Sequence, residues 1–411
     1  MTYKTPSTWT KIKISDLFEE ICDKNHPDAN VLTIIQGTGT VLRENSGREI
    51  IYDEKSLANY KYVKKGDFII HLRSFEGGLE IANQDGIISP AYIILRPKLP
   101  VAFIYLYAVF HSKRFINQTM APAVEGVRDG RNVKYDVLKK QTILFPPLSE
   151  QKKIAEILSA QDKIIELKEK LIAEKQRQKK YLMQVLLDEN IKKTPFKING
   201  IKIDKKKWEK KKIGEIAKLS SGNTPRRNDS QNFKGNVCWL SSGELKQKYI
   251  NDTEEKISKI AVKSSNLCLY KSGTVIIALY GLEAIGIRGT CSILKVECTI
   301  SQACMAFTEF KSVLNEYFYY WYLFKGYAIG AKYAQGSKQQ NINSDLMSSL
   351  IMLCPPFHEQ QAIAAVLSTA DEEISLLQRD LEQEKLKKKA LSQLLLSGIV
   401  RVNNTKEIKN A

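Results

Sequence analysis

Pro146-Pro-Leu-Ser-Glu-Gln151 and Pro355-Pro-Phe-His-Glu-Gln360 decide the fold of this 411-residue chain. A shift of 209 positions aligns the two stretches without a gap. The register continues far beyond them and pairs Ile154 with Ile363, Leu158 with Leu367, Asp162 with Asp371, Leu182 with Leu391 and Leu186 with Leu395. A match this long indicates a tandem duplication, which has to be recognised before any fold is assigned.

Each copy predicts one long helix that begins after its Pro-Pro pair. Proline cannot continue a strand ladder and keeps the residue before it extended. Ser149 can cap the first helix, and Glu150 and Glu359 lie where the helix dipole favours an anion. Gly398 and Asn190 are plausible C-terminal stops. At 1.5 Å per residue each helix would be roughly 60 Å long.

Apolar residues in both helices follow alternating steps of four and three, a period typical of a coiled-coil seam. In the first helix polar residues (Gln161, Lys168, Lys175, Lys179) interrupt the seam. A helical hairpin packed in a common core is the alternative. The duplication favours pairing of the two helices with each other, and the tandem layout favours an antiparallel arrangement. The seam residues are Ile154, Leu158, Ile165, Ile172, Leu182 and Leu186 in the first helix and Ile363, Leu367, Ala370, Ile374, Leu377, Leu381, Leu391 and Leu395 in the second.

A globular region precedes each helix. Trp9-Thr-Lys-Ile-Lys-Ile is echoed by Trp208-Glu-Lys-Lys-Lys-Ile, and Lys64-Lys-Gly-Asp-Phe-Ile-Ile by Lys271-Ser-Gly-Thr-Val-Ile-Ile. Short β-branched runs and one aromatic helical stretch in each region predict an α+β fold with two mixed α/β domains in tandem. The predicted layout is a first domain at 1–145, a helical spacer at 146–190, a second domain with a lysine-rich entry at 191–354, a second spacer at 355–401 and a polar tail at 402–411.

The composition indicates a folded, strongly basic protein. The net charge is +18, from 63 Lys and Arg against 45 Asp and Glu. The predicted helices contribute little of this excess: residues 149–190 carry nine basic and eight acidic side chains, and residues 356–401 carry six and seven. A basic excess on globular regions points to a polyanion such as nucleic acid. Lysine enrichment from an A/T-rich genome is the alternative, and charge alone does not decide between them.

Compartment and metal signals are weak. The longest aromatic-apolar run, Tyr317–Phe324, is far shorter than a membrane span, and the N-terminus carries no apolar signal region. The seven cysteines include no C-x-x-C pair, so the sequence favours buried, reduced thiols over a zinc site. We therefore expect a cytoplasmic protein without a metal.

No catalytic motif is intact. Cys354-Pro-Pro-Phe357 resembles the Asn/Asp-Pro-Pro-aromatic signature of amino-group DNA methyltransferases, but it lacks the Asn or Asp that would hold the target amine. Gly37-Thr-Gly39 has no third glycine at the dinucleotide-loop spacing, and no G-x-x-x-x-G-K-[ST] phosphate loop is present. The sequence therefore predicts a non-catalytic chain.

Candidate DNA contacts gather in turn-rich loops. Ser220-Ser-Gly-Asn-Thr-Pro-Arg-Arg carries adjacent arginines, and Arg reads guanine bidentately while Asn and Gln read adenine. Gly126–Asn132 and Gly336–Asn341 occupy corresponding places near the ends of the two domains, and Asn132 and Asn341 are 209 positions apart. For single residues a solvated surface role is the alternative. The candidates are Arg73, Arg128, Arg131, Asn132, Thr224, Arg226, Arg227, Tyr280, Lys338, Gln339, Gln340 and Asn341.

The tandem arrangement, with PPL-x-EQ-x-x-I-A-x-I-L opening a long helix, resembles the specificity subunits of type I restriction–modification systems. The resemblance covers about residues 9–400 and is weakest in the recognition loops of the first domain, which has no Thr-Pro-Arg loop. It implies two target-recognition domains, each reading one half of a bipartite double-stranded DNA target. It also implies spacer helices that dock two modification subunits through Glu150, Gln151, Ile154, Glu359, Gln360 and Ile363.

The resemblance also implies that the modification subunits bring AdoMet, that restriction subunits bring ATP and Mg, and that this chain itself binds no cofactor. Two other functions stay open from the sequence. One is the specificity module of another adenine-methylating defence system, and the other is a coiled-coil DNA-binding regulator. Co-purification would separate them, because a methyltransferase partner supports a restriction system and a homodimer alone supports a regulator.

Overall fold

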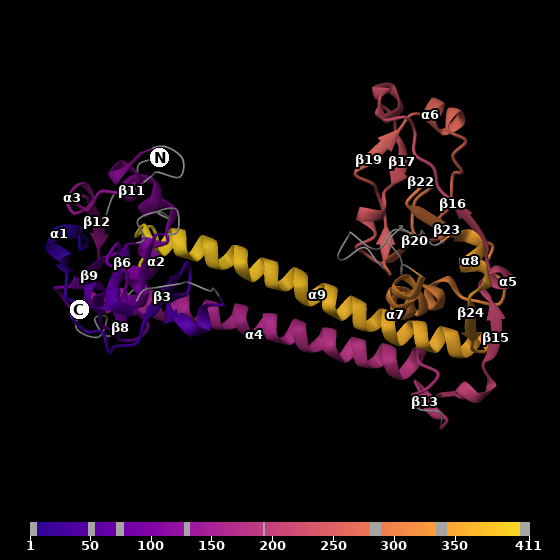
Figure 1. Ribbon diagram of the computed structural model, residues 1–411, viewed down its shortest axis with the longest axis horizontal. Helices are drawn as coiled ribbons and strands as arrows, with labels where there is room; N and C mark the ends of the chain where they lie inside the picture. Colours follow the sequence, from indigo (N-terminus) through magenta and orange to yellow (C-terminus); the bar gives the residue numbers. More distant parts are fainter. Residues whose placement is uncertain are drawn as a thin grey trace, which may run out of the picture. The chain divides into compact units, whose positions relative to one another are not determined.

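The computed structural model describes residues 6–47, 54–70, 78–126, 132–191, 194–279, 289–333 and 343–402. The chain forms two compact units (Figure 1). Unit 1 comprises Met1–Glu169 and Arg379–Ala411, and unit 2 comprises Lys170–Gln378. Each unit therefore contains one globular domain and parts of both long helices.

The two long helices are α4 (Leu148–Leu187) and α9 (Phe357–Leu396), each of 40 residues. Both begin directly after their Pro-Pro pairs, as predicted. In unit 1 the first part of α4 runs antiparallel to the last part of α9, because Asp162 pairs with Lys388 and Lys168 with Asp380. In unit 2 the remaining parts do the same, through Lys175 with Glu373 and Lys179 with Asp371. The predicted antiparallel pairing is confirmed.

The polar residues that interrupt the seam of α4 bind acidic side chains of α9. Gln161 Nε2 donates to Glu384 Oε2 at 2.6 Å, and Lys175 Nζ lies 2.6 Å from Glu373 Oε1. Apolar seam positions are buried on either side, among them Leu158 and Ile172 in α4. The seam is therefore apolar near its ends and mixed apolar and ionic between them, which favours one register.

The domain of unit 1 is built from small antiparallel sheets. The main sheet has the order β2-β9-β6-β7, and β1 pairs with β12 beside it. Additional pairs are β3 with β4, β5 with β8 and β10 with β11. The strand bounds are β1 Thr10–Lys13, β2 Phe18–Ile21, β3 Leu32–Ile35, β4 Gly39–Leu42, β5 Lys61–Val63, β6 Phe68–Ile70, β7 Leu79–Ile81, β8 Gly86–Ile88, β9 Ile93–Pro97, β10 Val124–Glu125, β11 Asn132–Val133 and β12 Thr142–Phe145.

The domain of unit 2 repeats this plan and enlarges it. The order β16-β23-β20-β21 corresponds to β2-β9-β6-β7, with β18 added at the edge, and β15 pairs with β24 as β1 does with β12. A further sheet, β19-β17-β22, corresponds to β4, β3 and β8 of unit 1, where β3 pairs antiparallel with β4 and a parallel bridge joins Val31 to Ile87 of β8. The bounds are β13 Phe196–Ile198, β14 Ile201–Ile203, β15 Glu209–Lys212, β16 Lys218–Ser221, β17 Val237–Leu240, β18 Tyr249–Ile250, β19 Glu255–Ile257, β20 Val275–Ala278, β21 Cys291–Leu294, β22 Cys298–Ile300, β23 Cys304–Thr308 and β24 Ile351–Cys354.

One aromatic-rich helix packs against the main sheet of each unit: α2 (Phe103–Phe110) in unit 1 and α7 (Asn315–Tyr333) in unit 2. Their registers correspond, because Tyr105 Oη donates to Leu144 O and Tyr317 Oη to Leu353 O. These rings fill the cores, as predicted. The shorter helices are α1 Ile14–Leu17, α3 Tyr135–Leu138, α5 Ile213–Ile216, α6 Lys259–Ser264 and α8 Ser344–Ser349, together with a π-helical turn at Phe115–Met120.

The lysine-rich entry to the second domain forms regular structure. β13 and β14 form a hairpin whose two turn residues, Asn199 and Gly200, both have positive φ. Lys205 follows and is only 8% exposed. Its Nζ donates to the carbonyl oxygens of Val185 (2.7 Å) and Asp188 (2.5 Å), so it caps the C-terminal end of α4.

Candidate nucleic-acid interface

The Thr224–Asp229 loop is the best-defined candidate for DNA contact. It leaves β16 and leads to the β17–β19 sheet. Arg226 is exposed, and no hydrogen bond or ion pair of its guanidinium is found within the described part of the chain. Thr224 is half-buried, and its backbone N–H donates to Asn223 Oδ1 at 2.8 Å. Arg226 is therefore free to reach a ligand from an ordered loop.

Arg227 occupies a different environment from its neighbour. Its Nη1 and Nη2 lie 2.5 and 2.8 Å from the two carboxylate oxygens of Glu255. Its guanidinium carbon lies 4.3 Å from the ring centroid of Phe233 and 5.0 Å from that of Trp239. The hydrogen bonds from Arg227 lower the pKa of Glu255, and the same bonds raise the pKa of Arg227. Sequence reasoning placed both arginines in one role, and the structure separates them.

Most other predicted DNA contacts lie outside the described residues. These are Arg73, Arg128, Arg131, Tyr280, Lys338, Gln339, Gln340 and Asn341. Asn132 is described: it opens β11, is exposed, and lies opposite Glu125 in the β10–β11 pair. The described residues therefore bring Thr224, Arg226 and Arg227 together in unit 2 and leave Asn132 as the described candidate of unit 1.

The residues predicted to dock partner subunits are buried inside their own units. Glu150, Gln151 and Ile154 are 7%, 0% and 0% exposed, and Glu359, Gln360 and Ile363 are 3%, 0% and 0% exposed. Gln151 Nε2 donates to Pro146 O at 2.9 Å, and its Oε1 accepts from Ala102 N at 3.1 Å. In this fold these residues fasten each helix to its own domain instead of forming a surface.

Sequence reasoning did not identify the residues that fasten the domains. Trp9 Nε1 donates to Glu150 Oε2 at 2.9 Å, and Trp208 Nε1 donates to Glu359 Oε2 at the same distance. In unit 1 Arg401 adds hydrogen bonds to both oxygens of Glu150, at 2.7 and 2.9 Å. The repeated Trp and the repeated Glu-Gln were a usable signal, because duplicated residues often share a contact. Arg401 and Glu255 carried no such signal.

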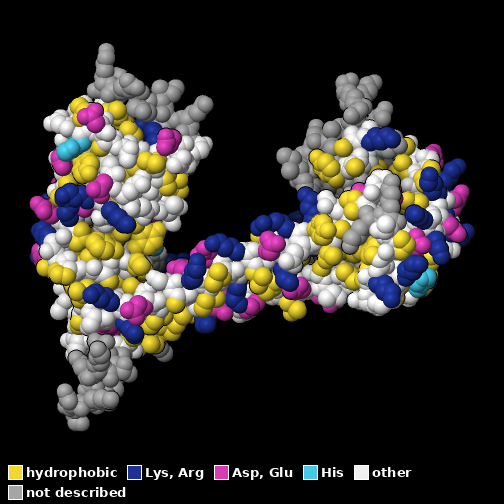
Figure 2. Space-filling view, turned by 90° about the horizontal axis from the view of Figure 1, so that it is seen from below, with side chains coloured by type: hydrophobic (Ala, Val, Ile, Leu, Met, Phe, Trp, Pro, Cys, Tyr) yellow, Lys and Arg dark blue, Asp and Glu magenta, His cyan; other side chains and the backbone are white. Residues whose placement is uncertain are grey.

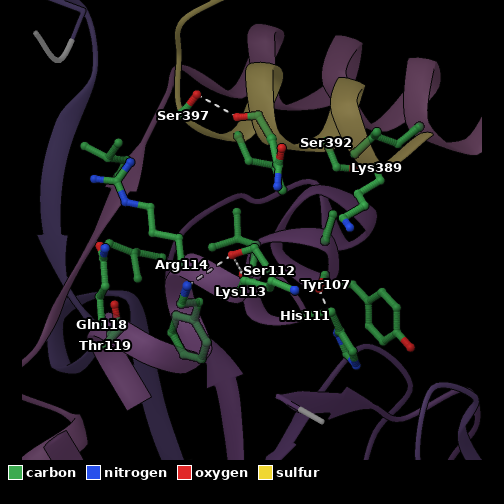
Figure 3. Close-up of a pocket in the computed structure, with 18 of the residues that line it drawn as sticks. Tyr107, His111, Ser112, Lys113, Arg114, Gln118, Thr119, Lys389, Ser392 and Ser397 are labelled. Atoms are coloured by element: carbon green, nitrogen blue, oxygen red, sulfur yellow. Dashed lines mark hydrogen bonds between the residues drawn. The ribbon is translucent and has the colours of Figure 1, made fainter. Parts of the chain in front are cut away.

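Unit 1 contains a cavity of about 710 Å³ between α2, the π-helical turn and the C-terminal end of α9 (Figure 3). Tyr107, His111, Ser112 and Arg114 line one side, and Lys389, Ser392 and Ser397 line the other. Its walls are mostly apolar, and they include the His111 imidazole. The charged lining residues are Lys11, Lys113, Arg114, Asp162, Lys388 and Lys389.

The same space in unit 2 is filled by side chains. The register of α2 and α7 matches Tyr320 to Ala108, and α9 Asp371 corresponds to Asp162 of α4. Tyr320 Oη donates to Asp371 Oδ2 at 2.7 Å, and Lys248 Nζ lies 2.6 Å from Ser368 Oγ. Burial lowers the pKa of Lys248, and it raises the pKa of Tyr320. The cavity thus marks a difference between the two duplicated units.

All seven cysteines are free. Cys291, Cys298, Cys304 and Cys354 are buried, as predicted, whereas Cys22 and Cys268 are exposed and Cys238 is half-buried. Burial raises the pKa of Cys304 to about 12 and that of Cys354 to about 11, so these thiols stay protonated and unreactive. Among the described residues, no group of three or more His, Cys, Asp and Glu side chains could hold a metal ion. No helix in the described ranges is long and apolar enough to cross a membrane.

Known proteins share both sequence and fold with this chain. The family model for the type I restriction modification DNA specificity domain matches residues 6–176 and 205–387. The MjaVIII specificity subunit, a type I restriction enzyme subunit of Methanocaldococcus jannaschii, is 25% identical over 424 residues, which cover 98% of this chain and 95% of the relative. The EcoR124I/EcoR124II specificity subunit of Escherichia coli is 25% identical over 163 residues, 39% of this chain and 40% of the relative.

Solved structures agree in fold. A chain from a study of complex assembly and conformational transition of the type I R-M system superposes with a TM-score of 0.63 at 18% identity, covering 97% of this chain and 100% of that chain. The HsdS subunit of Thermoanaerobacter tengcongensis superposes with a TM-score of 0.53 at 17% identity, covering 97% and 99%.

Proposed function

Because this chain belongs to the family of type I restriction–modification DNA specificity proteins, we propose that each of its two domains reads one half of a bipartite double-stranded DNA target. The observation that carries this proposal is the duplicated plan of the two domains, each with its own helix start fastened by a Trp–Glu pair. Two related readers in one chain suit two separate half-sites. The net charge of +18 supports binding to the DNA backbone.

We propose that the chain itself is not catalytic. Its relatives carry the name specificity subunit, and its sequence contains no intact AdoMet or phosphate loop. In the proposed complex modification subunits supply AdoMet, restriction subunits supply ATP and Mg, and the complex works in the cytoplasm, where the DNA is. The purified chain should therefore transfer no methyl group to DNA alone and should direct adenine methylation once a modification subunit is added. Methyl transfer by the chain alone would overturn this assignment.

We propose further that two modification subunits dock on the outward faces of the paired helices. Large apolar side chains are exposed there: Leu167 is 53% and Leu386 57% exposed in unit 1, and Tyr181 is 62% and Leu376 58% exposed in unit 2. Figure 2 shows such apolar side chains among the charged ones along the helices. Exposed apolar surface of this kind is typical of a protein interface, and both units present it, as two equivalent partners require.

The docking proposal is tested by placing a charge in the proposed interface. Leu167→Glu and Leu376→Glu should each reduce the amount of modification subunit that co-purifies with the full chain. Gln176→Glu, an exposed polar position of α4 on the side of the helix away from Leu167, is the matched control and should leave co-purification unchanged. Unchanged co-purification in the Leu167→Glu/Leu376→Glu double variant would exclude this face.

A further inference from the structure

The Thr224–Asp229 loop is held in place by side chains on both of its flanks. Trp239 Nε1 donates to Asn223 O at 3.2 Å, and Asn232 Nδ2 donates to Arg226 O at 3.0 Å. Asn223 Nδ2 also donates to Ser265 O at 2.9 Å. The backbone before Pro225 is thereby fixed to β17 and the backbone after it to the helical turn at Ser230–Phe233, and Pro225 itself is buried. A loop fixed in this way presents its exposed side chains in a defined direction.

Arg227 is the side chain that joins this loop to the sheet. Glu255 begins β19 and lies directly opposite Trp239 in the antiparallel β17–β19 pair. The strand register therefore places the Glu255 carboxylate next to the Trp239 indole. Two N–H groups of Arg227 donate hydrogen bonds to the two carboxylate oxygens of Glu255, and the rings of Phe233 and Trp239 lie near its guanidinium. Bidentate pairing needs the planar guanidinium, which lysine cannot replace.

The adjacent arginines consequently differ in what they can do for a ligand. Arg227 would have to give up two charge-assisted hydrogen bonds and two ring contacts before it could read a base. Arg226 is exposed and has no such contacts among the described residues. The bidentate edge that an arginine recognises in DNA is the O6 and N7 pair of guanine in the major groove.

We propose that Arg226 reads a guanine of the second half-site, and that Arg227 and Glu255 are positioning residues which aim it. This inference rests on the proposed function, because it assumes that the domain of unit 2 reads DNA. It assigns to Glu255 a part in specificity, although an acidic residue would by itself repel DNA. It also gives Arg226 and Arg227 different roles, although both are arginines of the same loop.

The test uses the full chain in complex with its modification subunit and duplexes that carry the mapped target. The affinity is measured for the target and for duplexes with single-base changes in either half. Arg226→Ala should lower discrimination at one G·C pair of the second half by about tenfold or more. Glu255→Gln and Arg227→Lys should each lower discrimination at that same pair, and the double variant should be no worse than the more affected single variant. Discrimination in the first half should not change.

Glu309→Gln is the matched control. It breaks the exposed Lys218–Glu309 ion pair of the same unit, whose atoms lie 3.2 Å apart, and it should leave all discrimination unchanged. Thermal unfolding of each variant separates aiming from folding, because a purely structural defect lowers the unfolding temperature and the affinity for every duplex together. Loss of preference at one base pair with an unchanged unfolding temperature supports the proposal.

Two outcomes would overturn the inference. If Arg227→Lys abolished discrimination while Glu255→Gln left it unchanged or made binding tighter, Arg227 would read the base and Glu255 would merely compete with DNA. If Arg226→Ala weakened binding equally to all duplexes, Arg226 would contact phosphate alone. Failure of the proposed function looks different: the unaltered complex would then show no preference in the second half-site.

Discussion

At the scale of single residues, the most informative contacts are the paired Trp–Glu hydrogen bonds. Both glutamates lie in the first turn of a long helix and are nearly buried, and each accepts a hydrogen bond from an indole N–H. Unit 1 adds the guanidinium of Arg401, which also contacts Thr8 Oγ1 at 2.7 Å. Arg401, 251 residues after Glu150, thus joins the start of α4 to the N-terminal segment of unit 1.

This pairing predicts an acid response of unit 1. Burial raises the pKa of Glu150, but the hydrogen bonds from Arg401 and Trp9 outweigh it, and the net pKa lies below the usual 4.5. A carboxyl group with a lowered pKa stabilises the fold above pH 4.5 and loses that contribution as the pH falls through its folded value. Arg401→Ala should lower the unfolding temperature at neutral pH and reduce its further decrease in acid.

Thermal unfolding followed from neutral pH down to about pH 3 measures this response. Arg379→Ala, at an exposed position of α9 in the same unit, should behave like the unaltered chain. An unchanged acid response in Arg401→Ala would show that Glu150 is not the group responsible.

The cavity of unit 1 yields a second prediction at this scale. Ala108→Tyr would place a ring where unit 2 has Tyr320, with its hydroxyl group near Asp162. Cavity-filling substitutions typically add about 0.5–2 kcal/mol to the free energy of unfolding, so the unfolding temperature should rise. Ala108→Ser, which adds a hydroxyl group but no ring, is the control. A lower unfolding temperature for Ala108→Tyr would mean that the two units are not equivalent at this position.

At the scale of elements, ionic pairs set the register of the long helices. Lys175→Glu would face Glu373 and should destabilise the helix pair by about 0.5–1 kcal/mol at low salt, since like charges then adjoin. Adding Glu373→Lys should restore the unfolding temperature by rebuilding the pair in reverse. High salt should reduce both effects. If the reversed pair failed to restore stability, the pairing would not depend on this contact.

The sequence predicted elements well where the cause was local. The helix starts followed from proline chemistry at Pro146-Pro147 and Pro355-Pro356, and the seam followed from its period. The β13–β14 hairpin was not predicted, although Asn199-Gly200 is a strong two-residue turn signal, because only the lysine content of the segment was considered. Turn chemistry was the better guide there.

The candidate site was less predictable because its contacts are not local. Arg227 and Glu255 are 28 residues apart, and they meet only through the pairing of β17 with β19. Nothing in the sequence alone indicates that register. Glu150 and Gln151 were docking candidates because of the family resemblance, but both are buried inside unit 1. Their burial depends on Trp9 and on the Ala102 backbone, which are distant in sequence.

At the scale of the whole molecule, both long helices contribute to both units, so the helices connect the two readers. We predict that the length of the helix pair sets the number of unread base pairs between the half-sites. The antiparallel pairing requires matched insertions: one heptad after Ala173 in α4 and one after Leu376 in α9. The mapped target of this variant should keep both half-site sequences and gain a longer gap. Methylation that persists only at the original spacing would contradict the prediction.

The central claim is that each domain reads one half of the target. The most direct measurement maps methylated adenines across a genome in cells that contain the modification subunit and either this chain or a chimaera. In the chimaera the region from Glu209 to Cys354, bounded by β15 and β24, is replaced by the corresponding domain of a relative. The account predicts a bipartite motif in which one half changes while the other half and the gap stay the same. A motif that changes in both halves, or an uninterrupted motif for the unaltered chain, would contradict it.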